Sequence, residues 1–313
     1  MGQESPSNPK KFPCPDCSFC QWCSDDRCNL CRGVGHPAGR KLCQAEQIAL
    51  FESLNRTPVD PGETARSSIP LADDETLDEL RGYDLRLIQP RNGYRFSLDP
   101  LLLCDFAEVP AQATIIDLGT GCGVIPLVLA RRAEGARLVG IEHQPAMAKL
   151  ARRNVQLNGL AERVTIQDAD VLDLRSGYPV DCFDLVLANP PFRVPGTGRV
   201  SPRPGRDLAR HESTAGLADF LEIAKYLVQP GGRICFIYHP ERLVEFMAIA
   251  HRLGLAVTRL RLVHGHVAAA ARMFLAELGK GCRESLQILP PLFVHDRNAM
   301  ASPSSGTPVK EAR

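Results

Sequence analysis

Short apolar runs alternate with amphipathic segments from residue 113 onward, and this order constrains the fold more than any other feature of the sequence. The runs have the length of buried strands, whereas the segments between them carry apolar residues at helical spacing. Regular alternation of this kind predicts a doubly wound α/β fold with a mostly parallel sheet between layers of helices. The strands are expected at 114–118, 137–141, 164–166, 183–188 and 234–238, with more within 255–262, 273–278 and 285–294.

Amphipathic helices are expected around these strands. Asp99-Pro100 fits an N-cap followed by a proline at the first helical position. Gly159 fits the left-handed residue that follows the end of a helix. Pro230-Gly231-Gly232 is expected to stop a helix before the strand at 234–238 begins. The expected helices span 99–106, 124–133, 144–158, 217–228 and 243–253.

Shifts in composition divide the 313 residues into a globular part and less regular flanks. Cysteine is concentrated near the start of the chain, and residues 55–74 are polar and contain Pro, Gly and Ser. The composition turns polar again after Val294. These shifts predict a small cysteine-rich extension, a linker, one large domain and a disordered tail. The expected boundaries are 1–47, 48–73, 74–296 and 297–313.

The overall charge selects no partner, because 37 Lys and Arg face 36 Asp and Glu and the formal net charge is +1. Any affinity for nucleic acid must therefore come from a local basic patch. No apolar run reaches the roughly 18 residues of a transmembrane helix, and the polar start lacks the apolar stretch of a signal peptide. We therefore expect a cytoplasmic protein with no membrane partner. A monomer is our expectation for the oligomeric state, although no feature of the sequence determines it.

A glycine-rich turn connects the first expected strand of the sheet to the helix that follows. Glycines at such a turn let the backbone pass close to a ligand. The spacing is Gly-x-Gly-x-Gly, not the Gly-x-Gly-x-x-Gly of dinucleotide folds, so the turn alone identifies no cofactor. The candidate cofactor-binding residues of this turn are Asp117, Gly119, Gly121 and Gly123.

Three further strand ends carry polar side chains. Glu142 ends the second strand, 19 residues after Gly123, where an acid can accept from both hydroxyls of a ribose. Asp168 and Asp170 follow the third strand, and a carboxylate there can accept from an adenine amino group. Asn189 ends the fourth. Because ligands bind at the carboxyl ends of parallel strands, the joint pattern predicts a nucleoside site beside Asn189.

The four residues Asn189-Pro190-Pro191-Phe192 end the strand at 183–188 and are our candidate catalytic residues. The side-chain carbonyl of Asn189 and a nearby main-chain carbonyl can both accept from one amino group. The paired prolines stiffen the turn, and the ring of Phe192 offers a face for a flat substrate. The motif predicts a clamp that holds a planar NH2-bearing group while another group is transferred to its nitrogen. The alternative is an ordinary turn at the end of a strand.

The order of Asp117–Gly123, Glu142, Asp170 and Asn189–Phe192 resembles the successive motifs of class I S-adenosylmethionine-dependent methyltransferases. This resemblance implies a seven-stranded methyltransferase sheet, S-adenosylmethionine as cofactor, and adenine N6, guanine N2 or a glutamine amide as acceptor. The chain also resembles the bacterial tRNA(Val) adenine-37 N6-methyltransferase family over roughly residues 74–295, which implies tRNA as partner. The first 50 residues depart from that pattern. The segments that carry the second resemblance are 74–78, 87–90, 93–99, 209–212 and 240–243.

An arginine-rich segment, residues 193–212, follows the clamp directly. It contains few acidic residues, and proline and glycine are frequent. A basic, flexible loop beside an acceptor pocket suits phosphate contacts on RNA. A solvated surface loop or a loop for a protein substrate would have a similar composition. The candidate substrate-binding residues are Arg193, Arg203, Arg206, Arg210 and His211.

Seven of the 12 cysteines lie near the start of the chain, in repeated Cys-x-x-Cys steps. Two such pairs have ten residues between them, which is close to zinc-ribbon spacing. With His36 the seven make eight ligands, enough for two tetrahedral zinc sites. An iron–sulfur cluster is the alternative metal group, and free thiols are the alternative without metal. The candidate ligands are Cys14, Cys17, Cys20, Cys23, Cys28, Cys31 and Cys43.

Three functions are compatible with these motifs. The first is a methyltransferase acting on the exocyclic N6 amine of an adenine in tRNA. The second is a protein methyltransferase acting on a glutamine amide of release factors, which would use the same four-residue clamp. The third is a metal-containing RNA-binding protein whose methyltransferase core is inactive, against which the complete motifs at 119–123 and 189–192 argue.

Overall fold

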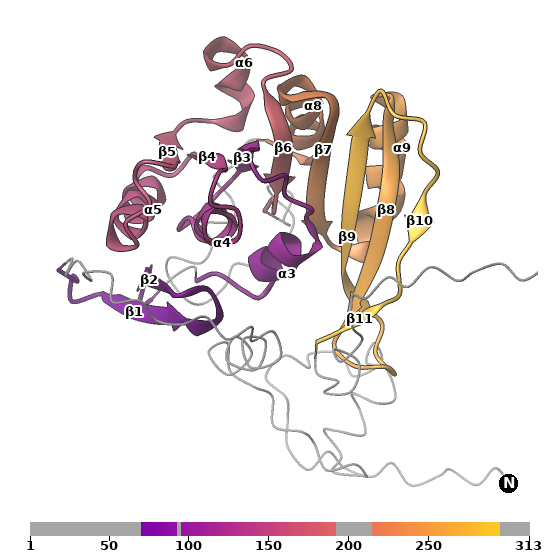
Figure 1. Ribbon diagram of the computed structural model, residues 1–313. Coiled ribbons are helices and arrows are strands. Elements are labelled where there is room, and N and C mark those ends of the chain that lie inside the picture. Colours follow the sequence, from indigo (N-terminus) through magenta and orange to yellow (C-terminus); the bar gives the residue numbers. More distant parts are fainter. Residues whose placement is uncertain (1–69, 93–94, 192–214, 295–313) are drawn as a thin grey trace, which may run out of the picture. The chain divides into compact units, whose positions relative to one another are not determined.

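The computed structural model describes residues 70–92, 95–191 and 215–294, which all belong to one compact unit of the chain, 47–313 (Figure 1). The predicted cysteine-rich extension, most of the linker, the arginine-rich segment and the predicted tail lie outside these residues, so the predicted domain boundaries stay predictions. Among the described helices, none is long and apolar enough to cross a membrane.

A nine-stranded sheet forms the centre of the described part, in the order β10-β8-β9-β7-β6-β3-β4-β5, with β11 also paired to β8. Strands β5, β4, β3, β6 and β7 run parallel, while β9 is antiparallel to both of its neighbours. These parallel pairs confirm the expected mostly parallel α/β sheet. Seven of its strands have five or more residues, and β10 and β11 have two each. The strands are β3 Thr114–Leu118, β4 Arg137–Glu142, β5 Val164–Asp168, β6 Phe183–Ala188, β7 Val228–Tyr238, β8 Leu255–His264, β9 Ala271–Lys280, β10 Gln287–Ile288 and β11 Leu292–Phe293.

Helices cover both faces of this sheet, because successive strand residues point to opposite sides. Ile115 of β3 packs in a core with α3, α4 and α5, while its neighbour Ile116 packs in a second core with α6, α8 and α9. The expected helices are thus present, with ends that differ from the predicted ones by at most one residue. The helices are α3 Asp99–Phe106, α4 Val124–Arg132, α5 Pro145–Leu157, α6 Leu174–Gly177, α8 Leu217–Leu227 and α9 Leu243–Arg252, with 3-10 turns η2 Arg81–Tyr83, η3 Val171–Asp173 and η4 Pro240–Arg242.

Strand β7 begins earlier than predicted. The strand was expected at 234–238, yet it starts at Val228 and includes Pro230-Gly231-Gly232. The pairing with β6 shifts register between Phe183 and Leu185, so these residues form a bulge in the strand. Gly231 has φ +82°, a conformation that suits glycine, and bulges tolerate both proline and glycine. Pro230-Gly231-Gly232 therefore follows the end of α8, as predicted, but these residues lie within β7 and not before it.

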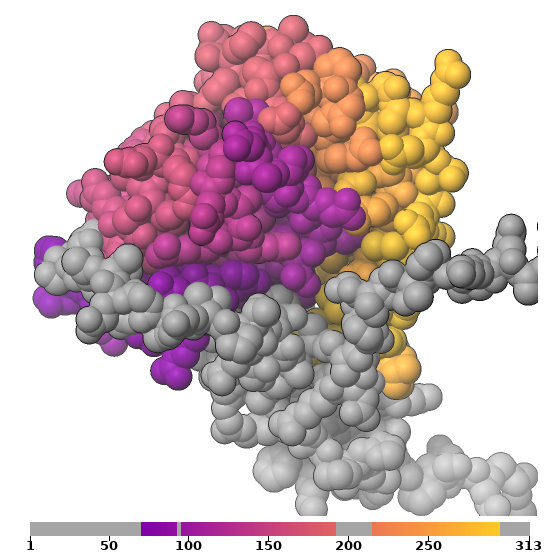
Figure 2. Space-filling model, in the orientation of Figure 1, coloured from indigo at the N-terminus to yellow at the C-terminus, as the bar shows by residue number. Residues whose placement is uncertain are grey.

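An antiparallel hairpin that the sequence did not predict precedes α3. It consists of β1 Glu75–Leu80 and β2 Leu85–Pro90 and is separate from the main sheet. Figure 2 shows its indigo surface lying along the magenta surface of the helices above it. The hairpin packs on α5 and adds Leu87 and Ile88 to the core on that side of the sheet.

Asn154 of α5 and Asn158, the residue that follows the end of α5, hold β2 through its backbone. Asn154, which is fully buried, accepts from the N–H of Ile88 at 2.7 Å and donates to the carbonyl of Ile88 at 3.0 Å. Asn158 makes the same pair of contacts to Arg86, at 2.9 Å and 2.7 Å. Asn154 also donates to the carbonyl of Cys122 at 2.9 Å. One side chain therefore joins the hairpin to the glycine-rich turn.

Candidate active site

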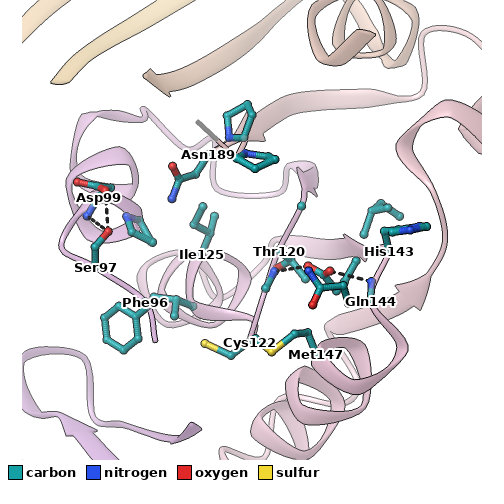
Figure 3. Close-up of a pocket in the computed structure, with 18 of the residues that line it drawn as sticks. Phe96, Ser97, Asp99, Thr120, Cys122, Ile125, His143, Gln144, Met147 and Asn189 are labelled. Carbon is teal, nitrogen blue, oxygen red and sulfur yellow. Dashed lines mark hydrogen bonds between the residues drawn. The ribbon is translucent and has the colours of Figure 1, made fainter. Parts of the chain in front are cut away.

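A cavity of about 500 Å³ lies at the carboxyl ends of the central strands (Figure 3). Its lining includes residues that follow β3, β4, β5, β6 and β7, as expected for a doubly wound sheet. The segment between the hairpin and α3, together with residues of α3, α4, α5 and α8, supplies the rest of the lining. Among the predicted site residues, those that line the cavity are Gly119, Gly121, Glu142, Asp170, Asn189, Pro190 and Pro191.

The glycine-rich turn brings its backbone to the cavity through left-handed conformations. Gly119 has φ +79° and Gly121 φ +57°, and both residues line the cavity. Gly123 has φ +88° but does not line it. A Cβ at Gly123 would lie 3.3 Å from the Cβ of Ala151, so this glycine permits close packing of α5 against the turn. The third glycine of the motif therefore contacts α5 and not the cavity.

Glu142 is fixed at the end of β4 by two backbone hydrogen bonds. Its Oε2 accepts from the N–H of Gly121 at 2.8 Å, and its Oε1 accepts from the N–H of Gln144 at 2.9 Å. Burial raises the pKa of this carboxyl, although the two bonds act in the opposite direction. Each oxygen keeps a lone pair beyond these bonds. The carboxylate is therefore already oriented to accept from a pair of ligand hydroxyls.

The acid that follows β5 at the cavity is Asp170. Asp168 is the last residue of β5 and does not line the cavity. Asp170 accepts from the N–H of Leu172 at 2.9 Å through Oδ1, and its Oδ2 lies 3.5 Å from Nδ1 of His143. The two acids weighed from the sequence are thus separated by the fold, and Asp170 is the one that a ligand in the cavity can reach.

Asn189 follows β6 and carries a buried acceptor. Its Oδ1 has no hydrogen-bond partner among the described residues, and the side chain lines the cavity together with Pro190 and Pro191. A buried amide oxygen without a partner is costly, so a ligand donor at this point would remove an energetic penalty. The fourth residue of the motif, Phe192, lies outside the described residues.

Asp117 lies inside the protein and not on the cavity wall. Only 1% of it is exposed, and neither carboxylate oxygen has a hydrogen-bond partner among the described residues. Burial raises its pKa to about 7, and the negative charge of Glu142 contributes in the same direction. The predicted direct contact of Asp117 with a cofactor stays a prediction, since the cavity lining does not include this residue.

The segment before α3 supplies cavity residues that the sequence did not single out. Arg95 is held by an ion pair with Asp78 and by a 3.1 Å bond to the carbonyl of Pro90. Asp99 was expected to cap α3, but it lies inside the first turn and makes no capping bond. The signals at this point were the Asp-Pro start of an apolar helix and the family resemblance of segment 93–99, and neither assigned a role to a single residue. The cavity residues from this segment are Arg95, Phe96, Ser97, Asp99 and Pro100.

Several predicted site residues cannot be placed, because they lie outside the described part of the chain. Within 70–92, 95–191 and 215–294, no group of three or more His, Cys, Asp and Glu is arranged to hold a metal ion. This finding does not bear on the cysteines of the extension. The predicted residues outside the described ranges are Phe192, Arg193, Arg203, Arg206, Arg210, His211, Cys14, Cys17, Cys20, Cys23, Cys28, Cys31 and Cys43.

Comparison with known proteins assigns the chain to a family. A family model described as a methyltransferase domain matches residues 111–264. A tRNA1(Val) (adenine(37)-N6)-methyltransferase from Porphyromonas gingivalis is 36% identical over 172 residues, which cover 53% of this chain and 67% of the relative. The chain belongs to the S-adenosylmethionine-dependent methyltransferases.

A second relative carries the same name, and a solved structure shares the fold. A tRNA1(Val) (adenine(37)-N6)-methyltransferase from Actinobacillus succinogenes is 32% identical over 156 residues, covering 49% of this chain and 64% of the relative. The crystal structure of a predicted O-methyltransferase from Agrobacterium tumefaciens superimposes with a TM-score of 0.52 at 25% identity. It covers 67% of this chain and 92% of that one.

The cavity of this methyltransferase fits S-adenosylmethionine. A Cβ at Gly140 would lie 2.8 Å from Ile166 and 2.9 Å from Thr120, so glycine there keeps β4 close to the turn. Glu142 and Asp170 line the cavity where the sequence predicts contacts with the ribose hydroxyls and with the adenine amino group, and Asn189 lines it where the acceptor is predicted. The residues present therefore suit the cofactor that the family uses.

Proposed function

We propose that this methyltransferase transfers a methyl group to the exocyclic N6 of an adenine in tRNA. The observation that carries the proposal is the buried oxygen of Asn189, which has no partner among the described residues and faces a cofactor-sized cavity. The printed names of the relatives support tRNA, and adenine 37 of tRNA1(Val) is the first substrate to test.

Asn189 acts as a hydrogen-bond acceptor in this proposal. The exocyclic nitrogen of adenine is a weak nucleophile, because its lone pair is delocalised into the ring. If Asn189 Oδ1 and the carbonyl of Pro190 each accept one N–H, the nitrogen approaches tetrahedral geometry and its lone pair is localised. S-Adenosylmethionine supplies a methyl group on a sulfonium, and loss of that methyl leaves a neutral thioether. The two carbonyl dipoles stabilise the positive charge that develops on nitrogen.

Alignment supplies the rest of the rate enhancement, so no strong general base is required. Phe192 would stack on the adenine once the base has left its stack, since aromatic rings commonly hold extruded bases in this way. After transfer the nitrogen carries one proton in excess, and that proton leaves to solvent. The roles of Pro190, Pro191 and Phe192 are thus to fix the acceptor and the plane of the base.

The arginine-rich segment is the proposed contact with the tRNA backbone. Arg193, Arg203, Arg206, Arg210 and His211 follow the clamp directly in sequence. Binding through phosphates releases counterions, so affinity for tRNA should fall steeply as salt is raised. A flat salt response would contradict this role. A tRNA substrate also agrees with the expected cytoplasmic location.

The test uses the full chain and an unmodified tRNA1(Val) transcript, with N6-methyladenosine measured by nucleoside mass spectrometry. We expect Asn189→Ala to lower the methylation rate by roughly a hundredfold to a thousandfold, as loss of one well-placed polar group does in other enzymes. Its affinity for S-adenosylhomocysteine, measured by titration calorimetry, should remain within about twofold. Asn189→Asp keeps an acceptor oxygen and should retain more activity than Asn189→Ala. An active Asn189→Ala enzyme would contradict the mechanism.

A glutamine amide is the other acceptor that the same clamp could hold. The discriminating measurement is the nucleoside profile of tRNA from a deletion strain, beside the methylation state of its release factors. Loss of one N6-methyladenosine signal supports the proposal. An unchanged tRNA profile with unmethylated release factors would assign the chain to protein methylation instead.

We also propose that the cysteine-rich extension binds metal, on the basis of its spacing alone. Zinc is the first choice and an iron–sulfur cluster the second. Metal analysis and the visible spectrum of the purified full chain distinguish the two, since only the cluster is coloured. Protein without stoichiometric metal would overturn the proposal.

A further inference from the structure

Arg261 of β8 is a half-buried arginine whose guanidinium has no hydrogen-bond or ion-pair partner among the described residues. Its Nε is buried, so part of the group has left water without a replacement contact. Arg259, two residues earlier and also half-buried, pairs with Glu108 and Glu277. An unpaired charge at such a position is unfavourable, so a bound anion would stabilise the protein here. The other half-buried arginines of the described ranges all have partners, and these are Arg86, Arg95, Arg153, Arg163, Arg233 and Arg242.

The surroundings of Arg261 do not neutralise its charge. Burial lowers the pKa of Arg261, Asp105 raises it, and the positive charge of Arg259 lowers it further. Asp105 is exposed on α3 and forms no ion pair with Arg261. The planar fork of a guanidinium matches two oxygens of one anion, as a carboxylate or a phosphate presents them. Arg261 is therefore a candidate site for an oxyanion that comes from outside the described residues.

Arg261 lies on the same face of the sheet as Asn189. Side chains alternate along β8, so Arg261 shares its face with Val263, which packs in the core that includes α3. Leu187, two residues before Asn189, packs in this core as well. Figure 1 shows α3 beside β9, with β8 as the next strand. An anion at Arg261 would therefore lie beyond α3, on the side of the sheet to which Asn189 points.

The strand register also places Arg261 at the level of Asn189. Arg261 lies opposite Leu275 of β9, and Leu275 lies opposite Ile237 of β7. Ile237 is one position beyond the partner of Ala188, so Asn189, which follows Ala188, lies at its level. Three strand spacings separate β8 from β6, which is about 14 Å across the sheet. This separation is short enough for one RNA strand to span.

We propose that Arg261 binds a backbone phosphate of the tRNA, on a nucleotide close to the adenine held at Asn189. The inference rests on the proposed function, because it takes tRNA as the substrate. An RNA strand carries a phosphate at every nucleotide, so a strand whose adenine lies at Asn189 presents further phosphates along this edge of the sheet. The contact would position the strand and contribute affinity without reading a base. A carboxylate of this chain is the other oxyanion that fits, and the test separates the two.

The test measures the affinity of the full chain for the unmodified tRNA1(Val) transcript over a series of salt concentrations, by fluorescence anisotropy. We expect Arg261→Gln to weaken binding by roughly threefold to tenfold at low salt. The slope of log affinity against log salt should fall by about one, as loss of one phosphate contact predicts. The KM for tRNA should rise by a similar factor, while kcat remains within about twofold, because the phosphate does not touch the reacting nitrogen. Arg261→Lys keeps the charge and should retain most of the affinity.

Arg252→Gln is the matched control, since Arg252 is exposed at the end of α9, on the other face of the sheet. It should change neither the affinity nor the slope. Binding of S-adenosylhomocysteine should remain within about twofold in every variant, and an equal loss for both ligands in Arg261→Gln would show a structural role and overturn the proposal.

The outcomes separate this proposal from the proposed function. Unchanged tRNA affinity and slope in Arg261→Gln, with methylation intact, would overturn the phosphate contact and leave the proposed function standing. Lower stability with unchanged tRNA affinity would overturn it too, and would assign Arg261 to a carboxylate of this chain. If the unaltered chain neither bound nor methylated tRNA, both proposals would fall.

Discussion

The two walls of the cavity are built in different ways. The sheet wall places Glu142, Asp170 and Asn189 at the ends of strands that backbone ladders hold in register. The hairpin wall places Ser97 and Asp99 on a segment outside the main sheet, held by side chains such as Asn154. A single substitution can therefore loosen the hairpin wall, while the sheet wall depends on the whole core. We expect the following changes to act on one wall at a time.

Loss of the Asn154 amide should have the largest effect on stability. Asn154→Ala leaves the N–H and C=O of Ile88 and the carbonyl of Cys122 without their partner in a buried region. We expect the free energy of unfolding to fall by about 4 kcal/mol, measured by urea denaturation followed by circular dichroism. Asn158→Ala, four residues further along the chain and half-buried at the end of α5, is the control and should cost about half as much. Equal costs for the two variants would contradict the role assigned to Asn154.

The pH dependence of stability tests the burial of Asp117 beneath the sheet wall. Its folded pKa of about 7 lies above the unfolded value of 3.8, so the folded protein binds the proton more tightly. The contribution to stability is therefore complete below about pH 4 and declines as the pH rises to 7. We expect a decline of about 2 kcal/mol between pH 5 and pH 7. Asp117→Asn should remove most of this pH dependence, and an unchanged slope would show that Asp117 is ionised in the folded protein.

Glu142 tests the nucleoside end of the sheet wall. In Glu142→Gln the new amide can accept only one of the two bonds from Gly121 and Gln144, and its NH2 group faces a donor. We expect roughly tenfold weaker binding of S-adenosylhomocysteine in calorimetry. Methylthioadenosine should weaken by the same factor, because it shares the ribose. A loss confined to S-adenosylhomocysteine would place the ribose elsewhere.

The smallest effect concerns the outer face of the hairpin. Arg153 of α5 pairs with Glu75 through two N–H groups, one of them 2.9 Å from Oε2, and this contact lowers the pKa of Glu75. Because the pair is partly exposed, we expect Arg153→Gln to lower the free energy of unfolding by about 1 kcal/mol, with a smaller cost at high salt. Arg81→Gln, which breaks a far more exposed pair with Glu79, is the control and should have no measurable effect.

The sheet wall could be predicted from the sequence, because strand period and strand-end polarity are local signals. Glu142 and Asn189 each follow an apolar run, and the fold then brings these ends together. The hairpin wall could not be predicted in this way. Its hairpin is held by Asn154 and Asn158, which in sequence resemble ordinary polar residues of an amphipathic helix. Asp99 was expected to cap α3 but lies inside its first turn, because the local pattern Asp-Pro does not distinguish a cap from a residue of the first turn.

The register of β7 was missed for a different reason. Pro230-Gly231-Gly232 is a strong local signal for a break, and α8 does end before it. A neighbouring strand can nevertheless accommodate extra residues as a bulge, which depends on the pairing with β6 and not on the local sequence. The arginine-rich segment and the cysteine-rich extension remain predictions, as they lie outside the described residues.

Asn154 and Asn158, in α5 and directly after its end, also match a helix to a strand in length. Four residues of helix advance about 6 Å along its axis, and two residues of strand advance about 6.6 Å. Asn154 and Asn158 can therefore satisfy Ile88 and Arg86 at once, as the backbone of a neighbouring strand would. This occupies the edge of β2 that β1 leaves free, and an occupied edge cannot recruit a strand from another molecule. Insertion of one residue between Asn154 and Asn158 would destroy this match and expose that edge.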